Sequence, residues 1–202
     1  YEAARNLVCS GAKPVAVTDC LNFGNPEKPE AFWQFKESVR GLADACEELS
    51  TPVVSGNVSF YNETPESAIY PTPVVGMLGV LDDVAKLVPS PFSREGDLII
   101  LRAAGWPEDP WPSLSGSELQ VMLDGEPSGP LPGLDAARQK ALFAAVLEMA
   151  AGRMLSSAHD VSEGGLAVCL AESCIAGGLG ADVELRLPGP VVPSLYGESA
   201  GV

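Results

Sequence analysis

The first half of the chain alternates short apolar runs with amphipathic segments, an order typical of an α/β fold. Apolar runs at 14–18, 52–55 and 73–80 predict strands. Residues 29–49 predict a helix, because apolar side chains recur there at steps of three or four. A shorter helix is expected within residues 1–10. The order strand–helix–strand predicts that the first two strands return to the same edge of one sheet.

The second half shows a similar mixture with longer polar connections. Residues 97–101 predict a strand, and the alternation of apolar and charged residues at 183–187 predicts another, half-exposed strand. Helices are expected at 134–151 and 166–175, the second ending at a glycine pair. Residues 106–112 hold three prolines and two tryptophans, which indicates a rigid surface loop.

Prolines and serines concentrate between the two halves, in residues 86–96, as in a linker. We therefore expect an α/β (α+β) chain of two pieces, residues 1–88 and 89–202. The sequence starts with Tyr1 rather than Met and stops on what reads as mid-domain sequence. It is expected to be part of a longer protein.

Composition excludes several classes of protein. The 27 acidic and 12 basic residues give a net charge of −15, which argues against a nucleic-acid or anionic membrane partner. With 46% hydrophobic and 19% charged residues, the chain is not a disordered acidic tail. The apolar segment 164–181 is interrupted by Glu172 and is no membrane span. Five cysteines and one histidine fit reduced, buried thiols in a cytoplasmic protein better than disulfides or zinc.

The first candidate site follows the strand at 14–18. Asp19 comes at the strand end and is followed by amides and a glycine, the place where open α/β sheets bind ligands. Its carboxylate could bind Mg²⁺ or a nucleotide. The alternative is that Asp19 and the nearby asparagines only shape a turn.

The second candidate site lies on the next strand. Gly56 would allow close approach of a ligand to the backbone. Asn57 and Ser59 are two apart on an extended segment and are expected on one face. Because both strands reach the same sheet edge, Asp19 and Asn57 are expected to share a site. A glycine bulge between outward polar residues is the alternative.

A third segment, residues 159–165, places Asp160 and Ser162 before a glycine pair that opens a helix. That arrangement suits either an anion site or an ordinary helix cap. No serine or cysteine partner for a catalytic triad is apparent for His159, so a structural role is expected for it.

Together these segments resemble phosphoribosylformylglycinamidine synthase, in the synthetase component of its small bacterial form. The resemblance runs along nearly the whole chain. It rests on VTDCLNFGNPEKP (17–29), FWQF (32–35), VSGNVSFYNE (54–63), PTPVVG (71–76), SGSE (115–118), HDVSEGG (159–165) and YGES (196–199).

The resemblance implies a tandem of A and B domains in the order A1, B1, A2, B2. The chain is similar to the later part of A2, to about Val88, followed by the first part of B2. Both pieces would be AIR-synthetase-like, one N-terminal and one C-terminal in type. The A1 and B1 half would be missing.

The family makes formylglycinamidine ribonucleotide from formylglycinamide ribonucleotide, ATP and glutamine-derived ammonia, with Mg²⁺. By resemblance, Asp19 and Gly56 contact ATP, Asn57 binds Mg²⁺ and Ser59 contacts the substrate. The family's catalytic histidine lies in A1, so no catalytic residue is assigned here. Implied partners are the A1/B1 half, a glutaminase and small carrier subunits.

Two alternatives remain open. Another ATP enzyme of this fold, such as an aminoimidazole ribonucleotide or selenophosphate synthetase, would share part of the pattern, although the long motif around Asp19 favours the first interpretation. The chain could also be a structural half that holds a nucleotide without turning it over.

Overall fold

The computed structural model of the chain describes residues 1–104, 113–131, 133–185 and 189–198. The fold is α/β, as expected, and the chain divides into two compact units. One unit is Lys13–Val80, and the other combines Tyr1–Ala12 with Leu81–Val202. The loop expected at 106–112 lies outside the described residues. The domain boundary expected between residues 88 and 89 stays a prediction.

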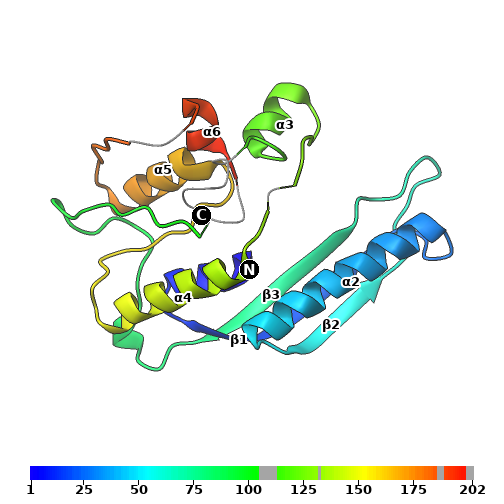
Figure 1. Cartoon of the computed structure of the whole chain (residues 1–202), viewed down its shortest axis with the longest axis horizontal. Helices are drawn as coiled ribbons and strands as arrows, with labels where there is room; N and C mark the ends of the chain where they lie inside the picture. Colours follow the sequence, from blue (N-terminus) through cyan, green and yellow to red (C-terminus); the bar gives the residue numbers. More distant parts are fainter. Residues whose placement is uncertain (105–112, 132, 186–188, 199–202) are drawn as a thin grey trace. The chain divides into compact units, whose positions relative to one another are not determined.

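The Lys13–Val80 unit is built on a three-stranded sheet with the order β2-β1-β3 (Figure 1). Strand β1 (Lys13–Asn22) is central, parallel to β2 (Val53–Ser59) and antiparallel to β3 (Thr72–Val80). Helix α2 (Pro29–Leu49) connects β1 to β2. This confirms the expected strand–helix–strand order, which brings the carboxyl ends of β1 and β2 side by side.

Helix α2 has a clear start and a clear end in the sequence. Pro29 stands in its first turn, where the missing N–H costs nothing, and Ser50 ends it in the left-handed region at φ 56°. Phe35 packs the helix against the carboxyl-end loops of the sheet. Its ring centroid lies 5.4 Å from that of Phe23 and 5.0 Å from that of Phe60, both in edge-on arrangements.

The pairing of β1 with β2 contains one irregularity. Val17 pairs with Val53, but the next residue, Thr18, pairs with Ser55, so Val54 is an extra residue on β2. From Thr18 onward the register is regular. The extra residue shifts β2 by one position and so decides which β2 side chains share a face with which β1 side chains.

The second unit is helical in its described part. Helix α1 (Glu2–Cys9) packs along α4 (Ala136–Ala151), and the ring centroid of Tyr1 lies 6.4 Å from that of Phe143. The helices expected at 1–10, 134–151 and 166–175 are confirmed; α3 and α6 were not predicted. The elements are α1 (Glu2–Cys9), the 3-10 turn η1 (Val84–Lys86), α3 (Glu118–Asp124), α4 (Ala136–Ala151), α5 (Gly165–Gly177) and α6 (Val191–Tyr196). No helix of the described residues is both long and apolar enough to cross a membrane.

The strand expected at 97–101 is absent, and residues 183–185 of the second expected strand are not extended into a sheet either. Leu98 and Ile100 are 89% and 72% exposed. A strand forms only where a neighbouring strand accepts and donates its backbone hydrogen bonds. The described residues of this unit contain no such strand, so the apolar run stays irregular.

The segment expected to be a linker, residues 86–96, is bonded to the second unit. The backbone N–H of Val88 donates to the oxygen of Ser10 at 3.1 Å, and that of Phe92 donates to the oxygen of Ser173 at 3.1 Å. These bonds tie the segment to the α1 end and to α5. It is therefore a packed connection and not a free tether.

Candidate functional site

Asp19 and Gly56 face one another across the parallel pair of β1 and β2. A Cβ added at Gly56 would overlap the Asp19 Oδ1 and would stand 3.1 Å from its Cγ. The carboxyl group therefore occupies the space that a side chain at position 56 would need. Close approach of a ligand to Gly56 stays a prediction; in the structure the group beside Gly56 is the Asp19 carboxylate.

Asn57 and Ser59 lie on the same face of β2, as their spacing predicted. Asn57 pairs with Cys20 and Ser59 with Asn22, in regular register. The Asn57 Nδ2 lies 3.5 Å from the Cys20 Sγ. The Asn22 Nδ2 contacts the same sulfur at 3.6 Å and donates to the Thr72 backbone oxygen at 3.2 Å. This face thus presents amides, a thiol and a hydroxyl.

Asp19 and Asn57 project from opposite faces of the sheet. Asp19 pairs with Gly56, one residue before the pair of Cys20 and Asn57. Successive side chains of a strand point to opposite faces of the sheet. The two residues are neighbours on the sheet, but Asp19 projects from the face of Gly56 and Asn57 from the opposite face. The expected proximity of the two residues is confirmed, but their side chains do not share a face, because the extra residue Val54 shifts the register by one.

Ser59 is held by the loop that follows β2. The Asn62 Nδ2 donates to the backbone oxygen of Ser59 at 2.9 Å and to that of Phe23 at 3.1 Å. The Ser59 Oγ donates to the Asn62 Oδ1 at 3.3 Å. The sequence reasoning did not single out Asn62. Its place three residues after a serine, directly after a strand, is a usual setting for an asparagine that bonds local backbone.

An ion pair joins the loops after β1 and β2. Lys28 Nζ lies 2.9 Å from Glu63 Oε2, and the backbone N–H of Asn25 donates to the same oxygen at 3.4 Å. The hydrogen bond from Lys28 lowers the pKa of Glu63 below its ordinary value. Glu63 thus ties the loop of the first motif to the loop of the second.

The described residues contain no cluster of three or more His, Cys, Asp or Glu side chains that could hold a metal ion. Asn57 fits Mg²⁺ in a narrower way. Its amide nitrogen is turned to Cys20, and an amide oxygen is a suitable ligand for a hard cation. Mg²⁺ commonly keeps waters and takes one or two protein oxygens together with phosphates. A single amide oxygen on this face is compatible with that mode.

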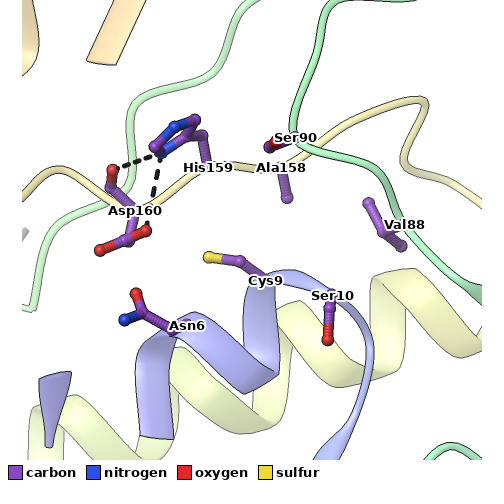
Figure 2. A pocket seen from close by; sticks show the side chains of 8 residues that line it. All are labelled: Asn6, Cys9, Ser10, Val88, Ser90, Ala158, His159 and Asp160. Atoms are coloured by element: carbon purple, nitrogen blue, oxygen red, sulfur yellow. Dashed lines mark hydrogen bonds and ion pairs between the residues drawn. The ribbon is translucent and has the colours of Figure 1, made fainter. Parts of the chain in front are cut away.

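His159 lines an open pocket of about 330 Å³ in the second unit, with residues of α1 opposite it (Figure 2). Its Nδ1 lies 2.8 Å from the Asp160 backbone oxygen, and its Nε2 lies 3.5 Å from Glu172 Oε2. The side-chain amide of Asn6, with its nitrogen turned toward Asp160, donates to both carboxyl oxygens of Asp160, at 2.8 and 3.0 Å. Both imidazole nitrogens thus face neighbouring oxygens; the structural role of His159 stays a prediction.

The thiols of Cys9 and Cys169 are protonated and unreactive near neutral pH. Burial, together with the negative charge of Asp160, raises the pKa of Cys9 to about 11. Burial and the same carboxylate raise the pKa of Cys169 to about 12. A thiol is a nucleophile only as a thiolate. Neither cysteine is therefore suited to covalent catalysis near neutral pH.

The glycine turn at 162–165 is held by a carboxylate. Glu198 Oε1 accepts from the backbone N–H of Gly164 at 2.8 Å and from that of Glu118 at 2.9 Å. These N–H groups lie at the starts of α5 and α3. The positive end of a helix dipole favours such a carboxylate. The third segment thus has a negative partner from within the chain.

Comparisons with known proteins match the chain in two parts. Residues 1–81 match the family model described as AIR synthase related protein, N-terminal domain. Residues 94–198 match the model described as AIR synthase related protein, C-terminal domain.

Curated relatives are similar over most of the chain. The phosphoribosylformylglycinamidine synthase subunit PurL of Moorella thermoacetica is 58% identical over 184 residues, 91% of this chain and 24% of that protein. The same subunit of Alkaliphilus metalliredigens is 51% identical over 185 residues, 92% of this chain and 24% of that protein. The chain therefore spans about a quarter of the length of these relatives.

Solved structures share the fold. PurL of Thermotoga maritima complexed with FGAR aligns with a TM-score of 0.65 at 21% identity, over 97% of this chain and 32% of that one. The same protein complexed with ATP aligns with a TM-score of 0.59 at 21% identity, over 98% and 30%. The structure of PurLQS from Thermotoga maritima aligns with a TM-score of 0.54 at 23% identity, over 98% and 28%.

Proposed function

Because the chain belongs to the AIR synthase-related protein family, we propose that it is part of a phosphoribosylformylglycinamidine synthase. The observation that carries the proposal is the 58% identity to a PurL subunit over 91% of the chain. The chain would supply the later part of the A2 domain and the first part of B2. An A1/B1 half of the same enzyme would complete it.

The proposed reaction is an ATP-dependent ligation. ATP phosphorylates the amide oxygen of formylglycinamide ribonucleotide and leaves as ADP. Ammonia then attacks the amide carbon and displaces phosphate, which leaves the amidine. We further propose that the nitrogen comes from glutamine, through a glutaminase and small carrier subunits, and that the enzyme is cytoplasmic.

We propose that Asp19 and Gly56 contact ATP, and that Asn57 and Ser59 contact Mg²⁺ and the ribonucleotide, with the two ligands meeting at the neighbouring carboxyl ends of β1 and β2. Mg²⁺, when bound, neutralises charge on the phosphate groups. The Asn57 amide oxygen would hold the ion, and the Ser59 hydroxyl would orient the substrate. Asp19 would act on the nucleotide alone, because its side chain projects from the opposite face.

A second candidate is a structural half that binds a nucleotide without turnover. The separation of Asp19 from Asn57 favours it, because a nucleotide held on the Asp19 face would lie away from the proposed metal ligand. In that case Asp19→Asn in the complete enzyme would weaken nucleotide retention or stability while leaving the ATP dependence of turnover unchanged.

The test uses the complete enzyme, meaning a protein of the relatives' length that contains this sequence. Purified enzyme is given the ribonucleotide, Mg²⁺–ATP and ammonium chloride, and formation of amidine, ADP and phosphate is measured. Equal amounts of the three products are expected. ATP hydrolysis without amidine would overturn the proposal. The isolated 202 residues are expected to bind Mg²⁺–ATP weakly and to show no turnover.

A further inference from the structure

Asn62 lies in the loop directly after β2 and holds the side chain of Ser59. Its Nδ2 lies 2.9 Å from the backbone oxygen of Ser59 and 3.1 Å from that of Phe23. Carbonyl oxygens only accept, so these two contacts fix which end of the Asn62 amide carries nitrogen.

The hydrogen of the Ser59 hydroxyl points to the side-chain oxygen of Asn62. Its Oγ lies 3.3 Å from Asn62 Oδ1, an atom that only accepts. The same Oγ accepts a hydrogen bond from the Asn62 Nδ2 at 3.2 Å, which uses one of its lone pairs. A serine hydroxyl has a single hydrogen and two lone pairs. Ser59 thus offers its remaining lone pair, and not a hydrogen, to a bound molecule.

The backbone of the loop keeps Asn62 in place. The backbone N–H of Tyr61 donates to the backbone oxygen of Gly24 at 3.1 Å, and the backbone N–H of Asn62 donates to that of Phe23 at 3.2 Å. The backbone N–H of Ile69 donates to the backbone oxygen of Asn62 at 3.0 Å. Tyr61 itself has a φ of 59°, in the left-handed region that residues other than glycine seldom adopt. Such a conformation persists only where the surroundings enforce it.

We infer that Asn62 is a positioning residue that fixes Ser59 as a hydrogen-bond acceptor, so that the ribonucleotide meets Ser59 through an N–H or O–H group and not through its phosphate. The inference rests on the proposed function, in which Ser59 contacts the ribonucleotide. A phosphate group at neutral pH is mainly an acceptor and needs donors around it. The amide N–H groups and the ribose hydroxyls are the donors that such a substrate carries.

The first experiment asks which part of the substrate meets Ser59. The kcat/KM of wild-type complete enzyme and of its Ser59→Ala variant is measured with the ribonucleotide and with the dephosphorylated ribonucleoside. One lost neutral hydrogen bond predicts a loss of roughly 3- to 10-fold. The same factor is expected with both substrates. A loss confined to the ribonucleotide would place the phosphate at Ser59 and overturn the inference.

The second experiment asks whether Asn62 acts through Ser59. Asn62→Ala should raise KM for the ribonucleotide by a similar factor and leave KM for ATP unchanged. The double variant Ser59→Ala/Asn62→Ala should be no worse than Ser59→Ala alone, since the two residues form one unit. Additive losses, or an equal rise in KM for ATP, would show that Asn62 only supports the loop.

Two further variants guard the result against misfolding. Asn62→Gln keeps both a donating and an accepting end of the amide and should raise KM less than Asn62→Ala does. Thr64→Ala removes hydrogen bonds of the same loop that do not involve Ser59, and should leave both KM values unchanged. A wild-type enzyme that forms no amidine would refute the proposed function. A fully active enzyme that Ser59→Ala leaves unaltered would refute the inference alone.

Discussion

The Asp19 carboxylate occupies the space beside the Cα of Gly56 that any larger residue would need. The two residues are register partners on β1 and β2. The size of the residue at position 56 and the position of the carboxylate are therefore coupled. This coupling makes the proposed nucleotide contact sensitive to a single methyl group.

Gly56→Ala in the complete enzyme is expected to displace Asp19 and to raise KM for ATP. Forcing a methyl group into a packed position costs about 1–3 kcal/mol. A loss of roughly tenfold in kcat/KM for ATP corresponds to ~1.4 kcal/mol. Steady-state kinetics with varied ATP measures the effect, and circular dichroism checks the fold.

Gly41→Ala is the matched control. Gly41 lies in α2, and an added Cβ there meets no atom within 4 Å. Alanine in a helix interior is expected to stabilise by about 0.5–1 kcal/mol, with no effect on KM for ATP. If Gly56→Ala behaved like this control, the Asp19 position would not matter for ATP.

Asp19→Asn and Asn57→Ala are expected to affect different ligands, because their side chains project from opposite faces. Asp19→Asn should raise KM for ATP at saturating Mg²⁺ while the protein stays folded. Asn57→Ala should lower turnover and raise the Mg²⁺ concentration needed for half-maximal rate. A positioned contact of this type is worth on the order of 2–4 kcal/mol.

The measurement is a Mg²⁺ titration of both variants after removal of metal by a chelator, followed by an ATP titration. The fold-decrease in kcat/KM of the double variant should equal the product of the fold-decreases of the two single variants, as it does for independent sites. Strong non-additivity would mean that the two residues serve one bound ion after all.

The relation between Asp19 and Asn57 shows where sequence reasoning fails. Apolar periodicity predicted β1, α2 and β2, and the order of elements predicted that the strand ends would be neighbours. The faces depended on the extra residue Val54, because a slip of one position turns every side chain of a strand over. Nothing in the local pattern marks that residue. Within β2 alone, period-two alternation correctly placed Asn57 and Ser59 together.

The prediction of a strand at 97–101 is wrong for a different reason. Its apolar run has the composition of a strand, but a strand also requires a partner that is distant in the sequence. The described residues of its unit contain no strand. Local pattern reports on burial tendency, whereas pairing is a property of the whole fold. The helices at 29–49 and 134–151, whose hydrogen bonds are internal, were predicted nearly to the residue.

Cys9 is expected to resist alkylation in the folded protein. At pH 8, three units below its pKa of about 11, roughly one Cys9 thiol in a thousand is ionised. Its reaction with iodoacetamide should accelerate about tenfold per pH unit up to that pKa. Asp160→Asn should lower the pKa of Cys9 and speed the reaction, because it removes a nearby negative charge. Mass spectrometry of labelled peptides at several pH values measures these rates, and unchanged labelling in Asp160→Asn would contradict the role given to Asp160.

Lys28→Met is expected to raise the pKa of Glu63 toward its ordinary value, because the hydrogen bond from Lys28 is the main cause of the lowered pKa. A carboxyl group whose pKa is lowered by folding stabilises the folded protein at pH values above the pKa of that group in the unfolded chain. That stabilisation disappears as the pH falls through the folded pKa. The difference in stability between wild type and Lys28→Met should therefore be present at pH 7 and be lost as the pH falls below the range in which carboxyl groups ordinarily titrate.

NMR titration of the Glu63 carboxyl group, with denaturant unfolding at neutral and at acid pH, tests this. Lys36→Met, at an exposed lysine of α2, is the control and should leave the titration of Glu63 unchanged. An identical Glu63 titration in wild type and Lys28→Met would rule out the ion pair in solution.

Glu198→Ala is expected to loosen the starts of α3 and α5 together. The first N–H groups of a helix have no partner within the helix, and Glu198 Oε1 accepts one from each of these two helices, at Glu118 and Gly164. Hydrogen bonds to a charged group contribute about 1.5–3 kcal/mol. Local opening that becomes easier by ~2 kcal/mol speeds amide exchange by roughly 30-fold. Exchange of the Gly164 and Glu118 amides should therefore accelerate together in Glu198→Ala.

Glu198→Gln keeps an accepting oxygen without the charge and should show a smaller acceleration of both amides. Glu163→Gln, at the exposed neighbour of Gly164, should show none. Acceleration at only one of the two amides would mean that the carboxylate caps a single helix and does not link the two.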